Sequence, residues 1–197
     1  IKMDNTNEHL HLLKRIYLLK QYPSLLNYIK QYCNDNPLAI MERDADGWTA
    51  IHFVSFYSNI SDYLQVLTIL VNSLVVKNLM NVETENNILD IKTSVGGFTP
   101  LHLLMFNIRN ADNVNTLKLL IENGANVNVQ TKCTHSTALH ILIETVCNYN
   151  LCPSSHEYKK IAILMLIRAG THLRSPDKNG YSVLHLLAMR SNVPIIN

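Results

Sequence analysis

The chain has 197 residues and a nearly balanced charge, with 17 Lys and Arg against 15 Asp and Glu. Hydrophobic residues make up 47% of it, enough for a packed core. The longest apolar run, Ile161 to Ile167, falls far short of the roughly 20 residues that a membrane span needs. We therefore expect no membrane partner, and because Lys and Arg are scattered, we expect no nucleic-acid partner either.

The N-terminal part carries two amphipathic segments. EHLHLLKRIYLLKQY begins at residue 8 and PSLLNYIKQYCN begins at Pro23, and both have apolar residues at helical spacing. Proline is well suited to the first position of a helix, where no backbone donor is lost. We predict a helix pair over residues 8–35.

Further along, a four-residue box recurs and predicts four helix starts. It reads Thr49-Ala50-Ile51-His52, Thr99-Pro100-Leu101-His102, Thr137-Ala138-Leu139-His140 and Ser182-Val183-Leu184-His185. Thr and Ser are good N-caps because the hydroxyl oxygen accepts a hydrogen bond from a free N–H of the first turn. An apolar segment of about two turns follows each box.

A second helical pattern follows each of the first three boxes. In NTLKLLIENGANVN, residues 115–128, apolar residues recur at helical spacing and Gly124 ends the helix. Residues 158–173 repeat the pattern with Gly170 as the stop. Residues 63–73 also repeat it, but Ser73 takes the place of the glycine.

The boxes and second helices resemble the ankyrin repeat over about residues 36–197. The resemblance implies an all-α solenoid of stacked antiparallel helix pairs joined by β-hairpin-like fingers. It divides the chain into a degenerate N-terminal capping repeat at 1–43, repeats at 44–94, 95–132 and 133–176, and the start of a further repeat at 177–197. Because a solenoid needs a finished cap, we expect a longer parent protein.

The repeats are longer than the usual 33 residues or so. The first residues of the four boxes are 50, 38 and 45 positions apart. We predict an enlarged finger over residues 74–96 and a long inter-helix loop over 144–158. Such insertions either drift neutrally or carry function, and both interpretations stay open. This divergence resembles the ankyrin proteins of large DNA viruses, especially poxviruses.

The four box histidines are not expected to bind a metal together. Stacked helices are about 10 Å apart, too far for one ion with ligand bonds of roughly 2 Å. We predict instead that each imidazole hydrogen-bonds backbone groups and a Thr hydroxyl.

The predicted loop over 144–158 offers a weaker metal motif. Cys147, Cys152 and His156, with Cys133 or His135 as a fourth ligand, fit no common zinc module. The four cysteines also follow no disulfide spacing, which indicates a reducing compartment. No nucleophile elbow or phosphate-binding loop is present in the sequence. We predict no active site, no metal and no cofactor.

A candidate partner-binding surface follows from the family resemblance. In ankyrin repeats, the residue between the turn glycine and the box points toward the concave surface. Here those positions hold Trp48, Phe98, Ser136 and Tyr181. Aromatic residues are enriched in binding hot spots. The other finger positions that we expect to join them are Ala45, Asp46, Lys178 and Asn179. Alternatively, the rings pack on the neighbouring fingers.

We therefore expect a non-catalytic protein-interaction module in the cytoplasm. If the protein is viral, it captures a host protein in the host cytoplasm, for inhibition or for recruitment to a ubiquitin ligase. Two alternatives stay open: a regulatory or substrate-recruiting region of a larger enzyme, and a structural spacer without a specific partner.

Overall fold

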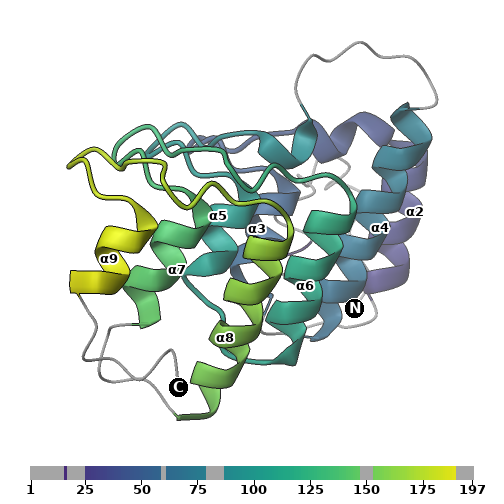
Figure 1. Ribbon diagram of the computed structural model, residues 1–197. Helices are drawn as coiled ribbons and strands as arrows, with labels where there is room; N and C mark the ends of the chain where they lie inside the picture. Colours follow the sequence, from purple (N-terminus) through teal and green to yellow (C-terminus); the bar gives the residue numbers. More distant parts are fainter. Residues whose placement is uncertain (1–15, 17–24, 59–60, 79–86, 147–152, 190–197) are drawn as a thin grey trace.

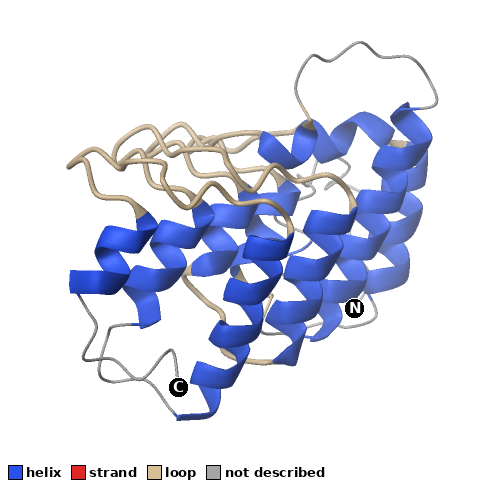
Figure 2. Ribbon diagram, viewed as in Figure 1, coloured by secondary structure: helices blue, strands red, loops and turns tan. Residues whose placement is uncertain are grey.

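The computed structural model describes residues 16, 25–58, 61–78, 87–146 and 153–189. Figure 1 shows two rows of helices, with the loops that join successive pairs gathered along one edge. Helices and loops make up the described part of the chain, and no strand is found in it (Figure 2). The all-α solenoid predicted from the sequence is confirmed.

The two rows contain alternate helices of the chain. The first row holds α3 (Ala50–Phe56), α5 (Pro100–Met105), α7 (Ala138–Val146) and α9 (Val183–Met189). The second row holds α2 (Leu25–Asp35), α4 (Ser61–Asn78), α6 (Ala111–Glu122) and α8 (Pro153–Arg168). Short 3-10 helices, η2 (Pro37–Met41) and η3 (Ile88–Asp90), precede the first two fingers. Each helix packs against its predecessor in the same row, which buries one continuous core.

The N-terminal prediction is met in the part that the structure describes. The second predicted helix is α2, whose Ile29 and Cys33 are buried in the common core. Of the first predicted helix, only Ile16 is described, and it is helical and fully buried.

The enlarged finger was predicted to begin too early. Helix α4 continues to Asn78 and has 18 residues, against 12 in α6. Helix α6 stops at Gly124, which has a left-handed φ of 88°. A left-handed glycine commonly ends a helix, and α4 has Ser73 at the equivalent position. Residues 74–78 are therefore helix, while residues 79–86 lie outside the described ranges.

The predicted loop over residues 144–158 is also mostly helix. Helix α7 extends to Val146 and α8 begins at Pro153, a favourable first residue. The Lys159 ammonium donates a 2.8 Å hydrogen bond to the Thr145 carbonyl, which ties α8 to the end of α7. The remaining residues, 147–152, lie outside the described part, and they include both cysteines of the metal motif.

Each finger has a left-handed residue at the position immediately before the residue predicted to bind a partner. Three of these are glycines, Gly47, Gly97 and Gly180, with φ of 78°, 68° and 83°. The third finger has His135 at this position, with φ of 51°. The turn therefore keeps its shape without glycine, although a Cβ is unfavourable there.

Two kinds of side chain close the fingers. In the first finger, the Asp44 carboxylate accepts from the N–H groups of Asp46 (3.0 Å) and Trp48 (2.8 Å). Asp177 does the same in the fourth finger. The middle fingers are one residue longer and use threonine. Thr93 and Thr131 accept through Oγ1 from the N–H groups of Phe98 and Ser136, respectively.

Successive fingers are joined by one backbone hydrogen bond each. The donors are the N–H groups of Ser94, Lys132 and Lys178, and the acceptors are the carbonyls of Asp46, Gly96 and Thr134, all at 2.9 Å. This approach leaves no room for a side chain at two of the turns. A Cβ on Gly47 would overlap Ser94 and one on Gly97 would overlap Lys132.

We predict that Gly97→Ala destabilises the protein more than Gly180→Ala. Both turns have left-handed φ, so each substitution should cost about 1 kcal/mol of unfolding free energy. The Gly97 methyl must also displace Lys132, which adds about 1–3 kcal/mol. No atom lies within 4 Å of a Cβ on Gly180, so it is the matched control. Equal losses in urea denaturation would contradict the close approach of the fingers.

Candidate partner-binding surface

A buried histidine ring links each of the capped helices α3, α5 and α7 to the following finger. The Thr49 N–H donates to His52 Nδ1 at 3.1 Å, so Nδ1 is an acceptor and the ring proton is on Nε2. Nε2 then donates to the carbonyls of Ile91 (3.0 Å) and Phe98 (3.1 Å). The predicted role of the box histidines, binding backbone and threonine, is confirmed here.

We call this link a histidine strut, and it recurs in the next two repeats. His102 Nε2 contacts the carbonyls of Val129 (3.0 Å) and Ser136 (3.2 Å). His140 Nε2 contacts the carbonyl of Tyr181 at 3.3 Å. Each strut thus holds the backbone of a residue that the sequence assigned to the partner-binding surface. The histidine of one repeat therefore positions the candidate side chain of the next.

Burial shifts the protonation of two struts. It lowers the pKa of His52 and His102 to about 4, and the hydrogen bonds to backbone carbonyls oppose this shift only in part. Both rings are therefore neutral near pH 7, as a single Nε2 donor requires.

The aromatic residues before the boxes pack on their own repeat. Trp48 lies edge-on to Phe56, with ring centroids 5.7 Å apart, and Phe98 lies edge-on to Phe106 at the same distance. Both rings are half-buried. Tyr181 is more open, with 40% of its surface exposed. Edge-to-face pairs of this kind add about 0.5–1.5 kcal/mol beyond burial, so Trp48 and Phe98 are held in fixed orientations.

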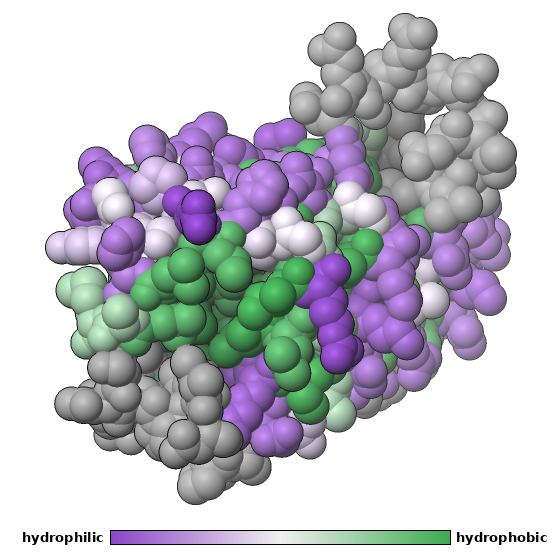
Figure 3. Space-filling model, in the orientation of Figure 1, coloured by the Kyte–Doolittle hydropathy of each residue, from purple (hydrophilic) through white to green (hydrophobic). Residues whose placement is uncertain are grey.

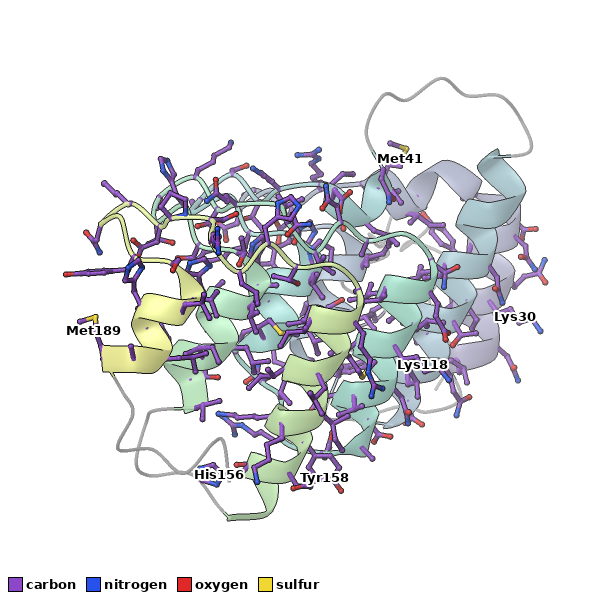
Figure 4. All side chains as sticks on the ribbon, viewed as in Figure 1. Lys30, Met41, Lys118, His156, Tyr158 and Met189 are labelled. Atoms are coloured by element: carbon purple, nitrogen blue, oxygen red, sulfur yellow. The ribbon has the colours of Figure 1, made fainter. Side chains whose placement is uncertain are left out.

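Sequence reasoning missed the second member of each pair. Phe56 and Phe106 each follow their partner by eight positions, which is a signal visible in the sequence. The same spacing leads from Tyr181 to Met189, whose side chain is 66% exposed at the end of α9 (Figure 4). In the third repeat the same eight-residue spacing joins Ser136 to Glu144, and neither is a large apolar residue. Ser136 is also only 4% exposed. The ladder of large side chains is therefore interrupted at that repeat.

The other predicted contact positions are exposed but lie on two separate fingers. Ala45 and Asp46 are on the first, and Lys178 and Asn179 are on the fourth. The fingers between them also expose their tips. Val95, on the second finger, is 72% exposed and was not predicted from the sequence.

The described residues contain no group of three or more His, Cys, Asp or Glu side chains that is placed to hold a metal ion. None of their helices is both long and apolar enough to cross a membrane.

The paired helices, stacked fingers and histidine struts together make up the fold of an ankyrin-type solenoid. Residues 96–132 match the family model for the ankyrin repeat. The fold is similar to the ankyrin repeat domain of Bcl-3, a member of the IkappaB protein family, with a TM-score of 0.64 and 19% identity. That likeness covers 93% of this chain and 65% of the other.

The sequence is also similar to that of a viral protein. Over 55 residues, 28% of this chain, it is 40% identical to the putative ankyrin repeat protein FPV232 of fowlpox virus (strain NVSL). The match spans only 11% of that protein's length. The predicted resemblance to poxviral ankyrin proteins is confirmed by this relative.

We predict that acid weakens the fold through His52 and His102. Unfolded histidine takes up a proton near pH 6.5, whereas these two rings do so only near pH 4. Their contribution is therefore complete above pH 6.5 and lost as the pH falls toward 4. Each should lower the unfolding free energy by about 1.4 kcal/mol per pH unit within that window.

The measurement is denaturant unfolding at several pH values for the wild type and His102→Gln. The variant should lose about half of this pH dependence. His185→Gln is the control, at the same box position but on an exposed ring. A wild-type stability that does not change between pH 6.5 and 4.5 would rule out the neutral buried struts.

Proposed function

We propose that the chain is a non-catalytic protein-interaction module that binds a partner protein through its finger tips and the adjoining ends of the first-row helices. The observation that carries this proposal is the ladder of large side chains at equivalent positions. Trp48, Phe98 and Tyr181 occur in three of four repeats, although the turn and the cap require no aromatic residue there.

The packing of the rings suits them to binding. Trp48 and Phe98 are each fixed by an edge-on aromatic neighbour, and the backbone of Phe98 is held by the His52 strut. A side chain that is ordered before binding loses little conformational entropy when a partner arrives. Tyr181 offers the most open ring, together with a hydroxyl group that suits the rim of an interface.

The charged finger tips supply a second element of recognition. Asp46 on the first finger and Lys178 on the fourth are exposed and of opposite sign. Charged groups at a rim influence the orientation and rate of association more than the affinity. We propose that the rings supply most of the affinity and that the tips set the direction in which the partner lies.

The poxviral relative suggests the setting of this activity. We propose that the protein acts in the cytoplasm of a host cell and captures a host protein, either to block it or to bring it to a ubiquitin ligase. The second outcome requires a segment outside this chain that contacts the ligase.

We predict that Tyr181→Ala weakens partner binding at least tenfold, a typical loss for a hot-spot aromatic. The partner would first be identified by affinity purification of the tagged protein from host cells and mass spectrometry. Its purified form would then be titrated by isothermal calorimetry. Tyr181 is 40% exposed, so this variant should keep its fold.

The control is Gln65→Ala, an exposed position on α4, which should leave the affinity unchanged. Trp48→Ala and Phe98→Ala are added to Tyr181→Ala in a triple variant, with thermal unfolding measured in parallel because both rings are half-buried. A triple variant that is folded and binds normally would refute this surface.

A further inference from the structure

Helix α8 departs from the other second-row helices on the side that faces away from the first row. Helices α6 and α8 align 46 positions apart, since the buried Asn113, Thr116 and Leu120 correspond to the buried Lys159, Ala162 and Leu166. Their stop glycines, Gly124 and Gly170, are also 46 positions apart. The two helices can therefore be compared position by position.

The outward positions are polar in α6 and apolar in α8. Asn115 and Lys118 of α6 correspond to Ile161 and Leu164 of α8. By the same burial pattern, α4 has Gln65 and Thr68 at these places. The repeat architecture thus accepts polar residues at both positions, and α8 has replaced both.

These two residues form an exposed stripe with Ile167. The exposed fractions of Ile161, Leu164 and Ile167 are 37%, 53% and 42%. They recur at every third position, so they lie along one side of the helix. Figure 3 shows hydrophobic surface gathered over this part of the molecule. We call these three residues the α8 stripe.

Stacking of a further repeat would not cover the whole stripe. Ile121 of α6, the counterpart of Ile167, is half-buried, and α6 packs against α8. Lys118, the counterpart of Leu164, remains 62% exposed despite that packing. A following repeat would therefore shield Ile167 but leave Ile161 and Leu164 in water. Exposed apolar patches of this kind mark interaction sites.

Around the stripe, cations outnumber carboxylates by three to two. Lys160 and Arg168 flank it on α8, and Lys118 lies at the level of Leu164 on the neighbouring helix. The carboxylates nearby are Glu157 and Glu122, and Glu122 lies 3.8 Å from the Lys118 ammonium. The pairing of Lys118 with Glu122 leaves Lys160 and Arg168 to attract an acidic partner, and Glu157 to repel it.

We propose that the α8 stripe docks an amphipathic helix of a partner protein, one with an apolar face and acidic flanks. A straight row of apolar side chains on a helix matches the row of another helix. Acidic flanks would face Lys160 and Arg168 and select the orientation. This surface is separate from the finger surface of the proposed function, so either can fail without the other.

Synthetic helical peptides provide the probe. One 18-residue peptide carries leucines along one face with glutamates on both flanks, a second has lysines on the flanks, and a third has a scrambled order. Fluorescence anisotropy with the full chain should show binding of the glutamate peptide at least tenfold tighter than that of the other two.

The variant is Ile161→Asn with Leu164→Lys, which gives α8 the residues that α6 has at the same positions. It should lose at least tenfold in affinity for the glutamate peptide and keep its unfolding midpoint, because both positions face outward. Leu164→Lys alone serves if the double variant is unstable. Tyr181→Ala should bind the peptide normally, which separates this surface from the fingers.

Four results would overturn the proposal: no binding of the glutamate peptide, equal binding of the lysine peptide, normal binding by the folded double variant, or self-association. Self-association would appear in light scattering as a dimer that the double variant abolishes, and it would assign the stripe to a second copy of the chain.

Discussion

The stack depends on a neutral imidazole ring buried between repeats. One ring accepts a hydrogen bond at the start of its own helix and donates to the backbone of the next repeat, so it couples local to long-range order. The ring must be neutral to do both, and burial keeps it so. In the last box the His185 ring makes the first contact with Ser182, whereas its Nε2 has no partner among the described residues.

The sequence predicted the features that depend on residues close together in the chain. The box residues set the starts of α3, α5, α7 and α9, because an N-cap and the N–H groups that it satisfies lie within one turn. The bounds of the insertions were less accessible. Helix α4 continues past Ser73 because no stop residue stands there. The end of α7 is held by Lys159, which lies in the next helix.

The sequence proposed positions for the candidate surface but not the contacts that their side chains make. It left open whether the rings face a partner or pack on neighbouring fingers, and the structure shows a contact that neither alternative named. Trp48 and Phe98 lie against Phe56 and Phe106 of their own repeats. This arrangement depends on where a helix directs a residue eight positions away, which short motifs do not reveal. The unusual apolar positions on α8 could be recognised only after the buried residues of α6 and α8 had been matched.

The hydrogen bonds between repeats also give the solenoid a polarity. The side of a repeat that faces its successor offers a finger carbonyl as acceptor and a histidine Nε2 as donor, as Asp46 and His52 do. The opposite side offers an N–H donor and carbonyl acceptors, as Ser94 and Phe98 do. The two sides are complementary to each other, and they lie at opposite ends of a repeat. Contacts between two different surfaces of this kind are heterologous. Growth of the stack is therefore head-to-tail, with its register fixed by the order of donors and acceptors.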